Sequence, residues 1–359
     1  MKVINVVGAR PNFMKIAPLT REMQARPRAF QPFLLHTGQH YDDNLSKIFF
    51  EQLKMPKPDA YLGVGSGTHA EQTAKIMVGF EPILEKQKPD LVVVVGDVNS
   101  TIACALTAAK KGVPVAHVEA GLRSFDWTMP EEVNRVLTDR LSKFLFTSSP
   151  ECADNLKREG ITEGIHFVGN TMIDSLLAFK KLANSTREVE KLGLRQCAFG
   201  LITLHRPSNV DTLEGLKRTI KLLEAASKHA KLVFPMHPRT RGTLEQAGLL
   251  EKVKKLALVT EPLGYLEFVN LESNAKFVLT DSGAVQEETT VLGVPCLTAR
   301  ANTERPITVT KGTNTLVFDE RALEKVLNQI DAGAYKKGVV PEKWDGKASQ
   351  RICDVLEKT

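Results

Sequence analysis

Two carboxylates in this sequence follow short apolar runs, where the strands of a sheet would present them to a ligand, and a third stands at the start of a helix. Asp97 follows the apolar run 91–95, and Glu119 follows the run 115–118. Glu131 comes directly after a proline that opens the next expected helix. Ligands in open α/β sheets bind beyond the carboxyl ends of the strands, so a carboxylate after a strand can meet a ligand. These residues are therefore candidates for a functional site.

Structural roles are the alternatives for these carboxylates. Asp97 would serve as the N-cap of the helix that follows it. A glutamate in the first helical turn, such as Glu131, stabilises the helix dipole without any catalytic task. For Glu119 and the nearby His117 a function is favoured, because ionisable groups among buried apolar residues are costly unless each has a partner or a task.

Cationic side chains stand at similar places and would bind an anion. The first apolar run ends at Gly8-Ala9-Arg10-Pro11, which opens a helix carrying Lys15. In the second half, two further runs end in His205-Arg206 and His237-Pro238-Arg239. Ordinary surface cations explain the first segment equally well when it is taken alone. The two His-Arg arrangements together favour an anion site.

A turn of small residues gives a more specific signal for phosphate. Asp281-Ser282-Gly283 follows an apolar run and precedes a helix, so its backbone N–H groups would form a phosphate site at the helix N-terminus. Glu288 comes a turn or so later, where it would accept hydrogen bonds from both hydroxyls of a ribose. The alternative is a capped helix with an exposed glutamate.

These residues need parallel sheets to position them. Short runs rich in β-branched residues alternate with helical patterns in both halves of the chain, which predicts an α/β fold of two Rossmann-like doubly wound domains facing a cleft. We expect domains at 1–168 and 169–340, and a C-terminal helix in 341–359 that returns to the N-terminal domain. The runs read as strands are 2–7, 33–36, 91–95, 115–118, 144–147, 201–204, 232–234, 256–259, 277–279 and 295–298.

Bulk properties exclude several classes of protein. The 359 residues suit two domains, and a net charge of +6 with dispersed basic residues suits an anionic small molecule as well as a nucleic acid. The five separated cysteines, the lack of a signal peptide and the lack of a long apolar run favour a cytoplasmic protein that binds no membrane. No glycine fingerprint of NAD binding, P-loop, zinc-protease motif or nucleophile elbow occurs.

A set of short motifs, taken in order, resembles those of the non-hydrolysing UDP-N-acetylglucosamine 2-epimerase family. The resemblance extends from about residue 2 to residue 320. The motifs are Gly8-Ala9-Arg10-Pro11, Gly38-Gln39-His40, Gly96-Asp97, His117-Val118-Glu119-Ala120-Gly121-Leu122-Arg123, Pro130-Glu131-Glu132-Val133-Asn134-Arg135, His205-Arg206, Asp281-Ser282-Gly283 and Thr303-Glu304-Arg305-Pro306.

The resemblance implies a glycosyltransferase-B-like fold and the activity of an isomerase that inverts a UDP-sugar at C2. The implied mechanism eliminates UDP and adds it again, without metal or nicotinamide. The resemblance also implies a cytoplasmic homodimer that serves cell-surface polysaccharide biosynthesis and has no nucleic-acid partner. The implied catalytic residues are Asp97, Glu119, Glu131 and His205. The implied substrate-binding residues are Ser282 and Gly283 at the phosphates, Glu288 at the ribose, Phe268 near the uracil, and Arg10, Lys15, His237 and Arg305.

Departures from the family pattern keep other activities open. Ala9 and Asn12 stand where the family commonly has Thr and Glu, and Ala284 replaces a second glycine. The alternatives are a 2-epimerase of a related UDP-diacetamido or uronic-acid sugar, a hydrolysing 2-epimerase, a glycosyltransferase, and a non-catalytic sensor of nucleotide sugars. The resemblance also implies an activator site that uses Gln39-His40 and an arginine, but residues 62–70 contain no arginine, so weak activation is expected.

Overall fold

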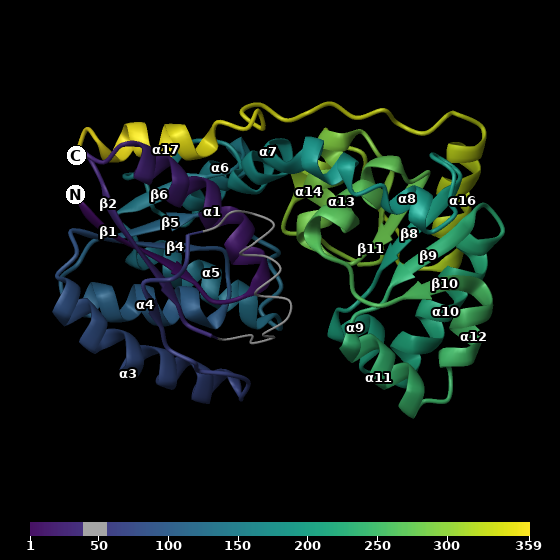
Figure 1. The fold of residues 1–359 in the computed structure, drawn as a ribbon, viewed down its shortest axis with the longest axis horizontal. Helices are drawn as coiled ribbons and strands as arrows, with labels where there is room; N and C mark the ends of the chain where they lie inside the picture. Colours follow the sequence, from purple (N-terminus) through teal and green to yellow (C-terminus); the bar gives the residue numbers. More distant parts are fainter. Residues whose placement is uncertain (39–55) are drawn as a thin grey trace. The chain divides into compact units, whose positions relative to one another are not determined.

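The computed structural model describes residues 1–38 and 56–359, without the side chains of Arg10 and Pro11. The chain divides into two compact units (Figure 1). The first unit comprises Met1–Ala178 and Glu342–Thr359, and the second comprises Phe179–Pro341. The boundary therefore falls inside helix α7 (Thr171–Ser185), whereas the sequence suggested a hinge just before this helix.

The described part of the first unit contains a sheet of seven parallel strands in the order β3-β2-β1-β4-β5-β6-β7. Their bounds are β1 Lys2–Val7, β2 Gln31–His36, β3 Ala60–Tyr61, β4 Leu91–Val95, β5 Val115–Val118, β6 Phe144–Thr147 and β7 Ile165–Phe167.

Successive residues of these strands point to opposite faces, and helices cover both faces. Ile4 and Val6 of β1 belong to a buried cluster with residues of α3 and α4. On the other face, Asn5 of β1 donates a hydrogen bond to Thr20 of α1 (3.1 Å). The helices of this unit are α1 Arg10–Ala25, α3 His69–Gln87, α4 Asn99–Lys110, α5 Pro130–Leu141, α6 Pro150–Arg158, α7, and α17 Ala348–Leu356.

The C-terminal helix α17 belongs to the first unit and lies beside α1 (Figure 1). Arg26, at the end of α1, forms ion pairs with Asp354 (2.7 Å) and Glu357 (3.1 Å). The buried carboxylate of Asp174 on α7 accepts hydrogen bonds from the first two amides of α17 (3.0 and 2.7 Å). The buried indole of Trp344 donates to the carbonyl of Ser148 (2.9 Å). These contacts give the amphipathic helix the covered face that its pattern requires.

The second unit, which the structure describes throughout, contains six parallel strands in the order β10-β9-β8-β11-β12-β13. The strands are β8 Phe199–Thr203, β9 Lys231–Pro235, β10 Ala257–Thr260, β11 Phe277–Thr280, β12 Cys296–Thr298 and β13 Asn314–Leu316. The helices are α8 Glu188–Lys191, α9 Pro207–Val210, α10 Leu213–Ser227, α11 Pro238–Gln246, α12 Leu250–Leu256, α13 Tyr265–Asn274, α14 Gly283–Leu292, α15 Pro306–Thr310 and α16 Glu320–Asp331.

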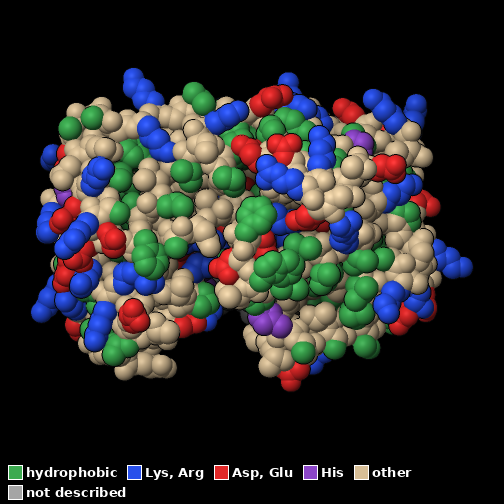
Figure 2. Space-filling model, turned by 180° about the vertical axis from the view of Figure 1, so that it is seen from behind, with side chains coloured by type: hydrophobic (Ala, Val, Ile, Leu, Met, Phe, Trp, Pro, Cys, Tyr) green, Lys and Arg blue, Asp and Glu red, His purple; other side chains and the backbone are tan. Residues whose placement is uncertain are grey.

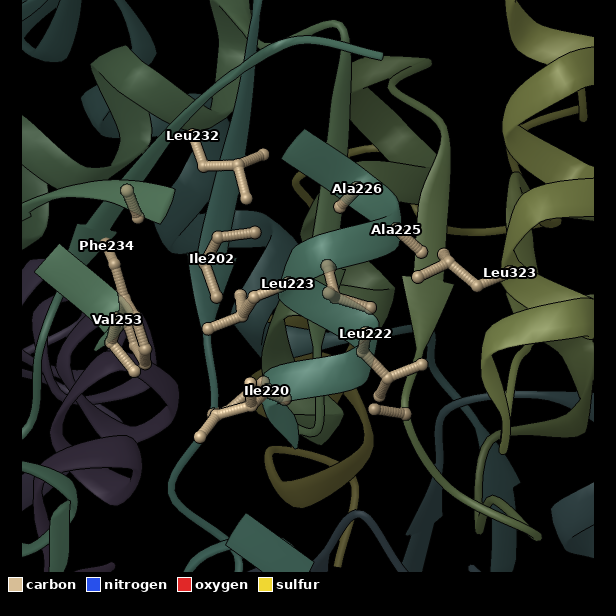
Figure 3. Close-up of a cluster of buried hydrophobic side chains, with 14 of the residues drawn as sticks. Ile202, Ile220, Leu222, Leu223, Ala225, Ala226, Leu232, Phe234, Val253 and Leu323 are labelled. Carbon is tan, nitrogen blue, oxygen red and sulfur yellow. The ribbon is translucent and has the colours of Figure 1, made fainter. Parts of the chain in front are cut away.

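The core of the second unit lies on both faces of its sheet. Figure 3 shows Ile202 of the sheet facing Leu223 of α10, and Phe234 of the sheet beside Val253 of α12, with Leu323 of α16 in the same cluster. A second cluster, on the opposite face, joins Leu201 and Val278 to residues of α13 and α14. The strands thus alternate their side chains between two helical layers, as doubly wound sheets require.

Charged side chains of both signs are interspersed on the face displayed in Figure 2. No helix among the described residues is long and apolar enough to span a membrane.

Candidate active site

The strand order reverses between β1 and β4, which makes this the switch point where doubly wound sheets bind ligands. Gly8 follows β1, and a Cβ on it would lie 2.1 Å from the hydroxyl oxygen of Ser100 in α4, so only glycine fits. Gly96 follows β4 with φ of +67°, a conformation that favours glycine. The backbones of both βα turns therefore approach their neighbours closely at the predicted site.

A buried ion pair lies beside this turn. The Nζ atom of Lys15 is 2.5 Å from Oε2 of Glu119, and both side chains are buried. A Cβ on Gly96 would lie 3.5 Å from that carboxylate oxygen and 3.7 Å from Nζ, so the turn after β4 packs against the pair. The other carboxylate oxygen of Glu119 is buried and has no hydrogen-bond partner in the described part of the chain. An unsatisfied buried acceptor is costly, which points to a missing donor such as a ligand.

Backbone strain accompanies this pair. Glu119 has φ of +72°, in the left-handed region that non-glycine residues rarely adopt. Such conformations persist where the surroundings fix them, often at functional sites. Lys15 is therefore no ordinary surface cation, and the interpretation of Glu119 as functional gains support.

His117 has a structural role. Its Nδ1 lies 2.6 Å from Asp139 and its Nε2 lies 2.9 Å from the carbonyl oxygen of Gly96. Asp139 also accepts a hydrogen bond from the amide of Gly121 (3.0 Å) and pairs with Arg123 (2.7 Å). Both ring nitrogens are thus engaged within the protein, and His117 positions the turn that follows β4.

Asp97 does not cap helix α4, because the N-cap position is Val98 and no side chain caps it. The carboxylate of Asp97 pairs instead with Arg135 of α5, and its backbone carbonyl accepts a hydrogen bond from Asn134 (2.9 Å). Glu131 lies half-buried in the first turn of α5, where the sequence placed it.

The second sheet has its own switch point, between β8 and β11. Asp281, directly after β11, is fully buried and accepts hydrogen bonds from the backbone amides of His205 (3.0 Å) and Arg206 (2.9 Å). The Nδ1 atom of His205 is 3.2 Å from Asp281. The rings of His205 and His237 lie 6.0 Å apart. Asp281 therefore links the end of β11 to the end of β8.

The pKa of His205 is shifted down. Burial lowers it from its ordinary value, Asp281 partly offsets this, and the positive charges of Arg206 and Arg239 lower it further. His237, in contrast, is exposed and caps helix α11 through a hydrogen bond from the amide of Arg239 (3.2 Å).

The N-terminus of α14 combines a helix dipole with a guanidinium group. Ser282 is the N-cap and makes no capping hydrogen bond with its side chain. A Cβ on Gly283 would lie 2.4 Å from Arg305, so this arginine packs directly on the glycine backbone. Arg305 is held there by ion pairs with Glu287 (2.7 Å) and Glu304. Amides and guanidinium together form a site suited to phosphate.

Glu288 is buried rather than exposed, so the alternative of a capped helix with an exposed glutamate is wrong. The phenol of Tyr265 on α13 donates a hydrogen bond to Oε1 of Glu288 (2.8 Å). Burial raises the pKa of Glu288 to about 8; Tyr265 acts in the opposite direction, and Glu287 raises the pKa further. Phe268 of α13 is half-buried and packs against the hydrophobic cluster that joins the sheet to α13 and α14.

Several residues at these sites were not identified from the sequence. Arg135, Asp139 and Tyr265 each contact a predicted site residue or the turn that carries one. The spacing of Glu131, Glu132 and Arg135 on one helix was a usable signal for a buried charge cluster. Gln39 and His40 lie outside the described residues, as does the side chain of Arg10. Among the residues that the structure describes, no group of three or more His, Cys, Asp or Glu could hold a metal ion.

Comparisons with known proteins agree with the geometry. A family model described as UDP-N-acetylglucosamine 2-epimerase matches residues 21–357. A protein of Methanococcus maripaludis, named a UDP-N-acetylglucosamine 2-epimerase homolog, is 48% identical over 99% of both chains. A UDP-2,3-diacetamido-2,3-dideoxy-D-glucuronate 2-epimerase of Pseudomonas aeruginosa is 42% identical over 100% of both chains.

A solved structure matches the whole architecture. The UDP-GlcNAc 2-epimerase of Methanocaldococcus jannaschii, in complex with UDP-GlcNAc and UDP, has a TM-score of 0.91 and 43% identity, and the match covers 100% of both chains. The predicted fold of two doubly wound α/β domains, glycosyltransferase-B-like, is confirmed. On its sequence, its fold and the arrangement of its strand ends, the chain belongs to the UDP-N-acetylglucosamine 2-epimerase family.

Proposed function

We propose that this chain is a non-hydrolysing UDP-N-acetylglucosamine 2-epimerase, which interconverts UDP-N-acetylglucosamine and UDP-N-acetylmannosamine. The observation that carries the proposal is the strained, buried Glu119, which pairs with Lys15 at the switch point and has one oxygen without a hydrogen-bond partner among the described residues. A protein that only binds nucleotide sugars has no need of such a carboxylate.

The chemistry explains why several carboxylates are wanted. The C2 proton of the sugar is weakly acidic, so its removal is easier when the C1–O bond to UDP breaks in the same elimination. The products are a 2-acetamidoglucal and UDP. UDP then re-adds to C1 while a proton is delivered to C2 from the opposite face. Acid-base groups are therefore needed on both faces of the ring.

In this proposal the first unit supplies the proton-transfer groups. Asp97 and Glu131 exchange protons with the two faces of C2, and Glu119 supports or relays a proton. The ion pair with Lys15 limits the cost of burying the Glu119 carboxylate.

The second unit would bind the nucleotide. Ser282, Gly283 and Arg305 suit the diphosphate, because they combine helix amides with a fixed guanidinium. Glu288 would accept the ribose hydroxyls, and Phe268 would lie near the uracil. His205 would assist the departure of UDP, either by charge or as a proton donor. We include Arg10 and His237 as further ligands of the substrate.

A homodimer in the cytoplasm, with a role in cell-surface polysaccharide biosynthesis, completes the proposal. The separation of the five cysteines supports a reducing compartment. The proposed route transfers no hydride, so it has no step that needs a nicotinamide.

A related sugar is the second candidate substrate. The chain is 42% identical to a 2-epimerase of a UDP-diacetamido-glucuronate and 44% identical to a UDP-N-acetylglucosamine 2-epimerase of M. jannaschii, so identity alone favours neither strongly.

The test is incubation of the purified chain with each UDP-sugar in D₂O. We expect the 2-epimer of UDP-N-acetylglucosamine with deuterium at C2, because the new C2 hydrogen comes from an enzyme acid that exchanges with solvent. Release of free sugar would instead indicate the hydrolysing activity. Retention of the original hydrogen at C2 in the product would exclude elimination.

A further inference from the structure

Asp97 belongs to a second charge cluster, whose other members have no role in the mechanism above. It consists of Asp97, Arg135, Glu132 and Ser124, all in the first unit, and we call it the Arg135 cluster. The side chains of Arg135 and Glu132 are each 2% exposed, whereas that of Asp97 is 28% exposed. Asp97 is thus the charged member of the cluster that reaches the surface.

Arg135 connects the charged members of the cluster. One guanidinium nitrogen pairs with Oδ2 of Asp97. Its Nε and Nη2 lie 2.9 and 2.7 Å from the same oxygen of Glu132, and Nη2 donates to the hydroxyl of Ser124 (3.3 Å). A guanidinium stays charged at every working pH and presents its donors in a rigid fork. Arg135 therefore holds Oδ2 of Asp97 from the buried side of that carboxylate.

Glu132 in turn fixes Arg135 to the loop before α5. Its carboxylate accepts hydrogen bonds from the amides of Ser124 (3.0 Å) and Phe125 (2.8 Å) and from the Ser124 hydroxyl (3.1 Å). Phe125 has φ of +57°, so the loop adopts a conformation that needs such anchoring. With its acceptors used in this way, Glu132 serves as a structural counter-charge.

We infer that Arg135 is a positioning residue for Asp97: it holds one carboxylate oxygen and so sets the direction in which Asp97 exchanges a proton with substrate. This inference rests on the proposed function, because it requires Asp97 to act on the substrate. Arg135 itself lies behind Asp97 and is nearly inaccessible, so its effect on turnover passes through Asp97.

The first test is Arg135→Lys, which keeps the charge but loses the fork that reaches both carboxylates. We expect kcat to fall on the order of a hundredfold, since small displacements of a catalytic group cost that much, while the affinity for UDP stays unchanged. Arg140→Lys is the matched control, because Arg140 is an exposed arginine on the same helix. A wild-type kcat for Arg135→Lys would overturn the inference.

A double-mutant cycle separates positioning from general damage to the fold. If Arg135 acts through Asp97, the variant carrying both Asp97→Asn and Arg135→Lys should be no slower than Asp97→Asn alone. If the loss of kcat in the double variant equals the product of the losses in the two single variants, action through Asp97 is refuted. If Arg135→Lys fails to fold, Glu132→Gln with Arg135→Met removes opposite charges together, and the same cycle is run on that background. Wild-type protein that does not epimerise UDP-sugars refutes the proposed function instead, so the two failures are distinguishable.

Discussion

The affinity for UDP is expected to rise between pH 6 and pH 8, because Glu288 must lose its proton before it can accept both ribose hydroxyls. An ionised carboxylate accepts hydrogen bonds at both oxygens, whereas a protonated one carries a hydrogen on one of them. Burial holds the pKa of Glu288 at about 8, so the folded protein at neutral pH carries mostly the protonated form. Binding would then release a proton.

The size of the effect follows from that pKa. With a value of about 8, roughly one tenth of the molecules are ionised at pH 7 and about one hundredth at pH 6. The affinity for UDP should therefore fall by about fivefold between pH 8 and pH 7 and by about tenfold, or ~1.4 kcal/mol, between pH 7 and pH 6. Between pH 8, where half are ionised, and pH 6, the expected loss is about fiftyfold.

Isothermal titration calorimetry with UDP at several pH values measures this dependence. The diphosphate of UDP also titrates, so Glu288→Gln provides the control: it retains the shape and lacks the titrating group. Tyr265→Phe should move the dependence to higher pH, because the phenol of Tyr265 donates to the carboxylate and lowers its pKa. An identical slope of affinity against pH for wild type and Glu288→Gln would refute the assignment of Glu288 to the ribose.

Three further predictions concern catalysis, stability and the phosphate site. Asp97→Asn, Glu119→Gln and Glu131→Gln should each keep the affinity for UDP and lower kcat on the order of a hundredfold or more, as steady-state kinetics would test; near-normal turnover removes that residue from the mechanism. Lys15→Met should lower the free energy of unfolding by about 3–5 kcal/mol in chemical denaturation, because it leaves a buried carboxylate unpaired, and adding Glu119→Gln should restore much of the loss. Gly283→Ala should weaken UDP binding while leaving the first unit unaffected, because the new Cβ displaces the guanidinium packed on it; unchanged affinity by calorimetry would argue against this phosphate site.

The positions of the site residues were predictable from the sequence because parallel strands read as short apolar runs. Each of the ten predicted runs corresponds to a strand, and Asp97, Glu119, His205 and Asp281 all follow strand ends. The short edge strands β3, β7 and β13 are absent from the ten runs, since two or three residues carry too little pattern. The boundary inside α7 was also missed, because a helical pattern does not reveal which sheet each of its turns packs on.

The partners of the site residues were not predictable, because pairing depends on contacts between distant parts of the sequence. Lys15 and Glu119 are 104 residues apart, and Asp97 and Arg135 are 38 apart. For His117 the sequence favoured a function, and the structure instead uses both of its nitrogens to hold Asp139 and Gly96. A local sequence pattern predicts the position of a charged side chain relative to a strand or helix. The role of that side chain depends on the partner that the fold places in contact with it.

The two units repeat one strand order and use their switch points in different ways. In the first unit, the carboxylates Asp97 and Glu119 each pair with a buried cation, an arrangement that fixes a charge at the expense of desolvation. In the second, Asp281 is satisfied by backbone amides, and the N-terminus of α14 lies against Arg305, which ion pairs with Glu287 and Glu304 hold in place. Proton transfer needs carboxylates in fixed directions, whereas a diphosphate needs amides and a guanidinium. The two switch points therefore differ in chemistry, because the side chains that follow β4 and β5 differ from those that follow β8 and β11, and this difference supports the proposed division between acid-base groups and an anion site.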